Sequence, residues 1–368
     1  MPQIFSPLQV GNCHLAHRIA MCPLTRWRAN AAHVHQSIGR EYYEQRASVR
    51  GTLLISEATF ISPRAAGYAN APGIWNDEQI QAWKEIVDAV HAKGSYIYLQ
   101  LWALGRAANA AVLKQEFGHD VVSSSAVPLK EGQEPPRALT EPEIHQFIAD
   151  YAQAAKNAVQ KAGFDGVEIH AANGYLIDQF TQDTCNKRTD NWGGSVENRA
   201  RFCLEVTRAV VDAVGAQNVG LRLSPYSTFQ GMRMADPVPQ FTYLVERLRD
   251  FKLAYLHVVE PRIAGNADIE SSDNIDWLVN LWGNTSPVVV AGGYKPDLAS
   301  VQAVADRFKE SDVIVGFGRY YISNPDLPFR IQKGIAATPY DRGTFYIPES
   351  PKGYIDYPFS EEFLAARL

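Results

Sequence analysis

Residues 166–180 read Gly-Val-Glu-Ile-His-Ala-Ala-Asn-Gly-Tyr-Leu-Ile-Asp-Gln-Phe. The segment 166–169 is short and apolar, and three polar side chains with different proton chemistry follow it: His170, Asn173 and Tyr175. Because buried polar groups must find partners, polar side chains at the end of a strand indicate a site. Histidine and asparagine can both donate hydrogen bonds to one ligand oxygen, and tyrosine can deliver a proton.

Short apolar runs alternate with amphipathic runs along most of the chain, which is typical of parallel strands connected by helices. The expected strands are 19–24, 52–60, 95–101, 166–170, 219–224, 254–259, 287–291 and 312–316, and the helices that follow them are 36–48, 77–92, 142–162, 196–214, 238–251, 275–282, 297–308 and 326–333. Capping-box patterns begin the second and third helices, at Asn76 and Thr140. Eight pairs predict a closed (β/α)₈ TIM barrel, a single domain over 1–368, with an insertion after strand three at about 103–140.

Composition narrows the class of protein. The 368 residues include 46% hydrophobic ones, and the net charge of −5 without a basic tract argues against nucleic-acid binding. The four cysteines are scattered, without the spacing of a metal site or a disulfide framework, which fits a reducing compartment; they are Cys13, Cys22, Cys185 and Cys203. We find no signal sequence and no apolar run of roughly 18 residues, so a cytoplasmic protein is expected, as a monomer or a homodimer.

In a TIM barrel the chemistry lies at the carboxyl ends of the strands. Strand seven ends at Gly292-Gly293, and strand eight ends at Gly316-Phe-Gly318, followed by Arg319. Loops at these two strands often bind phosphate, because glycine lets backbone N–H groups approach an anion. The pattern therefore predicts a phosphate site there, although ordinary turn glycines would give the same sequence.

Two further polar residues lie within apolar strands. Arg222 needs an anion or a polar ring as a partner, and a salt bridge to Glu57 or Glu168 inside the barrel would also satisfy it. Gln100 needs several hydrogen-bond partners, which a heterocycle with amide edges supplies. Thr25 follows the first strand and could simply cap a turn. The aromatic residues are either core residues or a stacking surface for a planar ligand; they are Tyr68, Trp102, Phe345 and Tyr346. No metal site is expected, since no second histidine or carboxylate cluster accompanies His170.

Taken in order, several long strings resemble the Old Yellow Enzyme family of flavin-dependent ene-reductases, in the plant and fungal branch related to 12-oxophytodienoate reductases. The resemblance covers nearly the whole chain. The strings are Phe5-Ser-Pro-Leu, Met21-Cys-Pro-Leu-Thr-Arg, Gly67-Tyr-Ala-Asn-Ala-Pro-Gly-Ile-Trp, Gln100-Leu-Trp-Ala-Leu-Gly-Arg, the segment at His170, Arg188-Thr-Asp-Asn-Trp-Gly-Gly-Ser-Val-Glu-Asn-Arg, Phe317-Gly-Arg-Tyr, Thr344-Phe-Tyr and Gly353-Tyr-Ile-Asp-Tyr-Pro.

This resemblance implies noncovalently bound FMN. The positions matching those around the isoalloxazine ring are Pro23, Thr25, Ala58, Gln100, His170 and Arg222, and those matching the phosphate end are Gly293, Gly318 and Arg319. It further implies that Thr25 binds flavin O4, that Gln100 reads the pyrimidine edge, and that Arg222 faces N1 and O2, where negative charge collects on reduction.

The resemblance also implies a ping-pong reaction. NADPH or NADH delivers a hydride to the flavin, and an α,β-unsaturated carbonyl compound or a nitroalkene accepts it. His170 and Asn173 would hold the carbonyl oxygen, and Tyr175 would protonate Cα. Tyr68, Trp102 and Tyr346 match or lie near positions that shape the substrate pocket.

Departures from other branches limit the assignment. A bacterial subclass has cysteine where this chain has Thr25, and Asn173 replaces the second histidine of other members. The segments 123–128 and 357–360 resemble fungal members of alkaloid and other specialised pathways. The alternative is therefore a pathway-specific reductase or isomerase on the same fold, and Tyr175 counts against isomerisation. The loop 262–274 covers the barrel mouth in relatives and varies among them, so the sequence does not identify the substrate.

Two other classes of function remain as alternatives. A flavin-free barrel hydrolase or lyase would use Glu57 and Glu168 as paired carboxylates. A non-catalytic flavin-binding protein would have no need of His170, Asn173 and Tyr175 together.

Overall fold

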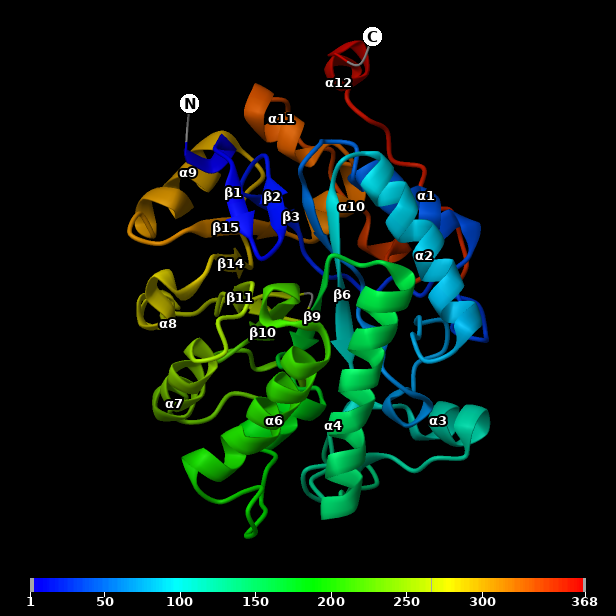
Figure 1. The fold of residues 1–368 in the computed structure, drawn as a ribbon, viewed down its shortest axis with the longest axis vertical. Coiled ribbons are helices and arrows are strands. Elements are labelled where there is room, and N and C mark those ends of the chain that lie inside the picture. The colour runs from blue at the N-terminus through cyan, green and yellow to red at the C-terminus, as the bar shows by residue number, and fades with distance from the viewer. Residues whose placement is uncertain (1–2, 266, 367–368) are drawn as a thin grey trace.

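Eight parallel strands close into a barrel in the computed structural model, which describes residues 3–265 and 267–366 (Figure 1). Their order around the barrel is β3 (Ile19–Met21), β4 (Leu53–Ile55), β6 (Tyr96–Trp102), β9 (Gly166–His170), β10 (Val219–Leu223), β11 (Tyr255–Val259), β14 (Val288–Ala291) and β15 (Val313–Phe317). Pairing of β15 with β3 completes the ring. The predicted (β/α)₈ fold is confirmed.

The helices follow the predicted runs closely. Those after successive barrel strands are α1 (Ser37–Arg46), α2 (Asp77–Ala92), α4 (Glu141–Lys156), α6 (Val196–Val214), α7 (Val238–Arg249), α8 (Asp276–Trp282), α9 (Leu298–Arg307), and α10 (Arg319–Ser323) with α11 (Leu327–Lys333). Both predicted capping boxes are present, at the start of α2 and of α4. Beyond α4 the helix continues as a π-helical turn over Asn157–Ala162. The short helix α12 (Glu361–Ala366) lies near the carboxyl end of the chain, at the top of Figure 1.

The predicted strand 52–60 is wrong as one element. The segment forms two strands instead, β4 and β5 (Thr59–Phe60). β5 pairs with Leu101 and Trp102, at the carboxyl end of β6. Between β4 and β5 the backbone N–H of Glu57 donates to the hydroxyl of Tyr43, 2.8 Å away, instead of to a neighbouring strand. Apolar periodicity could not reveal this, because the partner is a side chain from α1.

The insertion between β6 and α4 has its own short elements. They are the turn Gly105–Ala107, α3 (Ala110–Phe117), β7 (Val122–Ser123) and β8 (Arg137–Ala138). Leu104, Ala107 and Leu113 from this segment pack in one apolar cluster with Trp102, the last residue of β6. The insertion therefore lies against one side of the barrel mouth.

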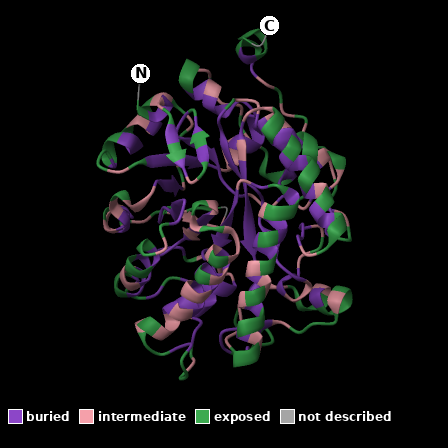
Figure 2. Cartoon of the chain, viewed as in Figure 1, coloured by how far each residue is buried: buried purple, intermediate pink, exposed green. Residues whose placement is uncertain are grey.

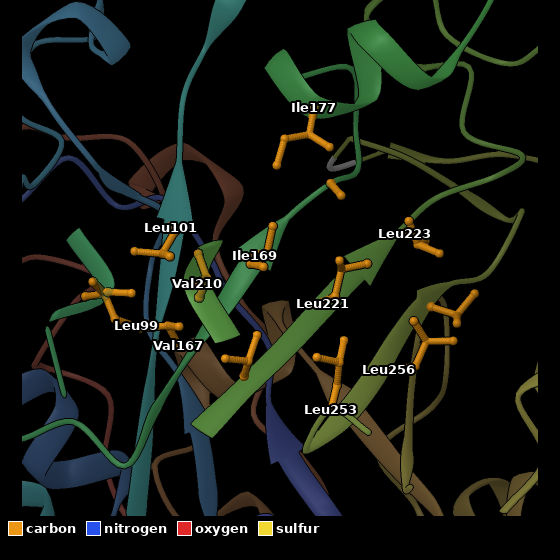
Figure 3. Close-up of a cluster of buried hydrophobic side chains, with 14 of the residues drawn as sticks. Leu99, Leu101, Val167, Ile169, Ile177, Val210, Leu221, Leu223, Leu253 and Leu256 are labelled. Carbon is orange, nitrogen blue, oxygen red and sulfur yellow. The ribbon is translucent and has the colours of Figure 1, made fainter. Parts of the chain in front are cut away.

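Alternating residues of each barrel strand face opposite sides. Side chains such as Leu101, Ile169 and Leu221 face outward, where Val210 of α6 and other helix residues cover them (Figure 3). Figure 2 shows the same division, with buried strands at the centre and helices exposed on their outer sides. Glu168 and His170 alternate with these apolar residues and therefore face the interior of the barrel.

The amino-terminal end of the barrel is filled with apolar side chains. A hairpin of β1 (Leu8–Val10) and β2 (Cys13–Leu15) packs under the barrel, against a cluster that includes Ile55, Val289 and Ile314. This end is closed, so the polar residues at the opposite end of the strands line the accessible opening.

All four cysteines are buried and free, as the scattered spacing predicts. Among the described residues, every helix is too short or too polar to cross a membrane.

We expect Gly220→Ala to destabilise the barrel, because a Cβ there would lie 2.2 Å from the ring of Tyr255 on the adjacent strand. Overpacking of this kind typically costs about 1–3 kcal/mol. Urea unfolding measures the loss. In a Tyr255→Leu background, Gly220→Ala should lower the free energy of unfolding much less. Equal losses in both backgrounds would show that the Tyr255 ring is not the cause.

Candidate active site

A cavity of about 420 Å³ opens at the carboxyl ends of the barrel strands. Its volume lies within the range typical of small-molecule sites. Thirteen of the residues predicted from sequence line it: Pro23, Thr25, Ala58, Gln100, Trp102, His170, Asn173, Tyr175, Arg222, Gly293, Gly318, Arg319 and Tyr346. Tyr68 is not part of the lining, but its ring contacts that of Trp102 edge-on, with centroids 5.7 Å apart. Residues from all parts of the sequence thus converge on one cavity.

Arg222 belongs to one row of residues on three adjacent barrel strands. Arg222 of β10 pairs in register with His170 of β9 and with His257 of β11. In the described part of the chain, Arg222 Nε and His170 Nδ1 are buried without a hydrogen-bond partner. Since buried polar groups without a hydrogen-bond partner are costly, a polar ligand in this cavity would complete the site.

The salt bridge considered for Arg222 is absent from the ion pairs within residues 3–265 and 267–366. Glu57 instead accepts a hydrogen bond from the backbone N–H of Arg26, at 3.2 Å, and lies 3.4 Å from His35. Burial raises the pKa of Glu57 to about 7. Because Glu57 and Glu168 have different partners, the geometry does not support a catalytic carboxylate pair.

Glu168 lies in the barrel interior and has three hydrogen-bond donors. Its carboxylate accepts hydrogen bonds from Gln100 Nε2 at 2.7 Å, His257 Nδ1 at 2.8 Å and the Tyr255 hydroxyl at 3.0 Å. Burial by itself would raise the pKa of Glu168, but the charges of His257 and Arg222 and the hydrogen bonds lower it below its usual value. The carboxylate is therefore ionised. Sequence reasoning considered only Arg222 as its partner and missed His257 and Tyr255.

The predicted proton donor lies between two other site residues. The ring of Tyr175 contacts the rings of His170 and Trp102 edge-on, with centroids 4.9 Å and 5.0 Å apart. Burial, reinforced by neighbouring tyrosines, raises the pKa of Tyr175 well above its usual value. Burial and then Arg222 hold the pKa of His170 well below its usual value. At neutral pH the tyrosine retains its proton, and the histidine is uncharged.

A tight turn positions Asn173. Its backbone has φ = +59°, a conformation that asparagine tolerates better than most residues. The Asn173 backbone N–H donates to Ser224 Oγ at 2.7 Å, and its carbonyl accepts from Gln230 Nε2 at 3.1 Å. The next residue, Gly174, donates its N–H to the buried carboxylate of Asp178 at 2.8 Å. The sequence analysis missed these three supports, although Asp178 was visible four residues after Gly174.

The carboxyl-terminal segment closes another side of the cavity with Phe345 and Tyr346. Two buried arginines hold this segment in place. Arg26 donates to the carbonyls of Phe345 and Gly353, and Arg28 donates to the carbonyls of Thr344, Phe345, Ser350 and Lys352. Arg26 and Arg28, which follow Thr25 closely, thus attach the segment 344–353 to the barrel mouth.

The predicted phosphate end lies at the ends of β14 and β15. Gly293 has φ = +73°, which favours glycine. Arg319 begins α10, and its guanidinium contacts the carboxylate of Asp268 through two nitrogens, at 2.6 and 2.8 Å. Asp268 also contacts Arg342, at 3.3 Å. The arginine therefore lies at the cavity with its guanidinium bound to a carboxylate, and a phosphate could accept from the same two nitrogens.

No group of three metal-ligating side chains occurs in the residues that the structure describes.

Comparison with known proteins identifies the class of this site. The model of the NADH:flavin oxidoreductase / NADH oxidase family matches residues 3–338. The crystal structure of Old Yellow Enzyme from Pichia sp. AKU4542 superposes with a TM-score of 0.90 at 41% identity, covering 98% of this chain and 94% of the other.

Two fungal relatives cover almost the whole chain. Chanoclavine-I aldehyde reductase fgaOx3 of Penicillium roqueforti is 63% identical over 100% of this chain and 99% of its own length. A protein of Epichloe festucae var. lolii, described as a probable inactive reductase easA, is 54% identical over 98% of this chain and 96% of its own length. High similarity in this group therefore extends to proteins thought to lack activity.

We expect Asp178→Asn to change how stability depends on pH. Burial, partly offset by hydrogen bonds from Gln182 and Gly174, raises the pKa of Asp178 from 3.8 to about 7. The ionised form is thus disfavoured in the folded state, so the penalty is absent below about pH 4, grows as the pH rises from 4 to about 7, and is constant above that. Relative to the variant, the parent should lose stability from pH 4.5 to 8, on the order of a few kcal/mol. Urea unfolding at both pH values measures this difference, and a constant difference would contradict it.

Proposed function

The chain belongs to the NADH:flavin oxidoreductase / NADH oxidase family, and we propose that it reduces the C=C bond of α,β-unsaturated aldehydes and ketones. FMN is the cofactor of this family, and a reduced nicotinamide supplies the electrons. The observation that carries the proposal is the convergence of His170, Asn173 and Tyr175 on one wall of the cavity.

The residues of the cavity fit FMN. Gln100 and Arg222 offer an amide and a positive charge to the polar edge of the flavin ring, and Arg222 Nε lacks a partner among the described residues. Gly293, Gly318 and Arg319 would hold the phosphate. When bound, FMN accepts a hydride from the nicotinamide and passes it to the substrate.

The chain's own residues then act on the carbonyl substrate. Because His170 is uncharged, it can donate one hydrogen bond to the substrate oxygen, and the Asn173 amide can donate a second. These two donors stabilise the negative charge that develops on oxygen as the hydride reaches Cβ. Tyr175, protonated at neutral pH, supplies the proton to Cα.

The relatives support a narrower substrate. Because the chanoclavine-I aldehyde reductase is 63% identical along the full length, we propose an α,β-unsaturated aldehyde of alkaloid metabolism, related to chanoclavine-I aldehyde. A simple enone or a nitroalkene would serve as a model substrate. The four free cysteines fit a reducing compartment, and the cytoplasm is therefore the proposed location.

The second candidate is an isomerase on the same fold. In that case the hydride and the proton added to the substrate would be removed again, which restores a double bond without net reduction. A protonated Tyr175 beside His170 favours net reduction, because it traps the product by protonating Cα.

Arg319→Ala should weaken FMN binding by roughly 1.5–3 kcal/mol, the usual value of a hydrogen bond to a charged group. Fluorescence titration of FMN-depleted protein measures the affinity. Arg342→Ala is the matched control, since Arg342 also contacts Asp268 but does not line the cavity. Equal losses of FMN affinity in the two variants would show that Arg319 does not bind the phosphate.

Tyr175→Phe keeps the ring and removes the acid. Stopped flow should show nearly normal flavin reduction by NADPH but reoxidation by cyclohexenone slowed by about 10²- to 10⁴-fold. Nitroalkenes should be less affected, because a nitronate is stable without immediate protonation. Equal slowing of both half-reactions would indicate damaged packing. Unchanged enone reoxidation would mean that another group supplies the proton.

A further inference from the structure

The amide of Gln100 has two ends with opposite hydrogen-bonding character, and one of them is bound to Glu168. Gln100 is 1% exposed and lies within β6, and its neighbour in register on β9 is Glu168. The Gln100 nitrogen lies 2.7 Å from Glu168 Oε1. An ionised carboxylate only accepts hydrogen bonds, so the nitrogen end must face it.

The orientation of Gln100 follows from this contact. Since the nitrogen is bound to Glu168, the carbonyl oxygen on the other branch of the amide is the end left available to the cavity that Gln100 lines. On the pyrimidine edge of oxidised flavin, O2 and O4 are acceptors and N3–H is the donor. A fixed acceptor at Gln100 therefore selects N3–H.

Glu168 is itself fixed from the opposite side. His257 and Tyr255, both on β11, donate to its second oxygen, and Gly220 leaves room for the Tyr255 ring. The carboxylate is fully buried and does not line the cavity. It therefore acts on a ligand only through its neighbours.

We propose that Glu168 is a positioning residue, which fixes the Gln100 amide with its oxygen toward the flavin N3–H. The inference rests on FMN as the cofactor and is independent of which substrate is reduced. If the carboxylate is replaced by an amide, Glu168→Gln, the side chain can donate as well as accept, and Gln100 is free to rotate. The specific contribution of Gln100 to FMN binding should then be lost.

A double-mutant cycle on FMN affinity tests this proposal without measuring activity. FMN release from the diluted full-length holoenzyme is followed by fluorescence. In the parent, Gln100→Leu should weaken binding about tenfold, as for loss of one hydrogen bond. In the Glu168→Gln background the same substitution should have less than a twofold effect. In a Tyr255→Phe background, which keeps the Glu168–Gln100 contact, Gln100→Leu should again weaken FMN binding about tenfold. Equal costs in all three backgrounds would overturn the proposal.

A second measurement needs no substitution at Glu168, in case that variant does not fold. The parent is loaded with ¹⁵N-labelled FMN, and the N3–H proton resonance is compared with that in Gln100→Leu. A downfield resonance in the parent that moves upfield in Gln100→Leu would support the orientation. Identical resonances would overturn it.

Discussion

One buried carboxylate connects the apolar half of the barrel to its polar mouth. Glu168 lies above the apolar floor and below the cavity, and it accepts hydrogen bonds from β6 and β11, on either side of the pair β9 and β10. A charge at this depth is tolerated only because all its partners are present. The arrangement orders the residues above it, since Gln100 is bound to it directly and Arg222 and His257 share one register row with His170.

The same geometry explains why one wall of the cavity can polarise a carbonyl and deliver a proton. His170 and Tyr175 are both shifted away from their ordinary pKa values by burial, the histidine downward and the tyrosine upward. Burial thus keeps His170 uncharged and the Tyr175 hydroxyl protonated at physiological pH. The turn that carries Asn173 is held by Ser224, Gln230 and Asp178, so the donors are placed before a substrate binds.

The fold and the lining residues at the strand ends, such as His170 and Arg222, could be predicted from sequence, because strand alternation and the rule for the carboxyl ends of barrel strands depend on local patterns. The assignment of Pro23 and Ala58 to the cavity came from the resemblance to a known family. The residues that hold the site residues in place could not be predicted. Tyr255 and His257 meet Glu168 across 87 and 89 positions of sequence, and Ser224 meets Asn173 across 51. Apolar strands give no signal for such pairs. The break at Glu57 was missed for the same reason, since its partner Tyr43 comes from a helix.

The proposed reaction is reduction of a conjugated C=C bond, rather than reduction of the carbonyl group or rearrangement of the alkene. The most direct test is the position of isotope in the product formed from an unsaturated aldehyde, with nicotinamide deuterated at C4 and, separately, with the reaction run in D₂O. We expect a saturated aldehyde with the nicotinamide deuterium at Cβ and one solvent deuteron at Cα. An allylic alcohol with the double bond intact, or an isomer formed without net consumption of nicotinamide, would contradict it.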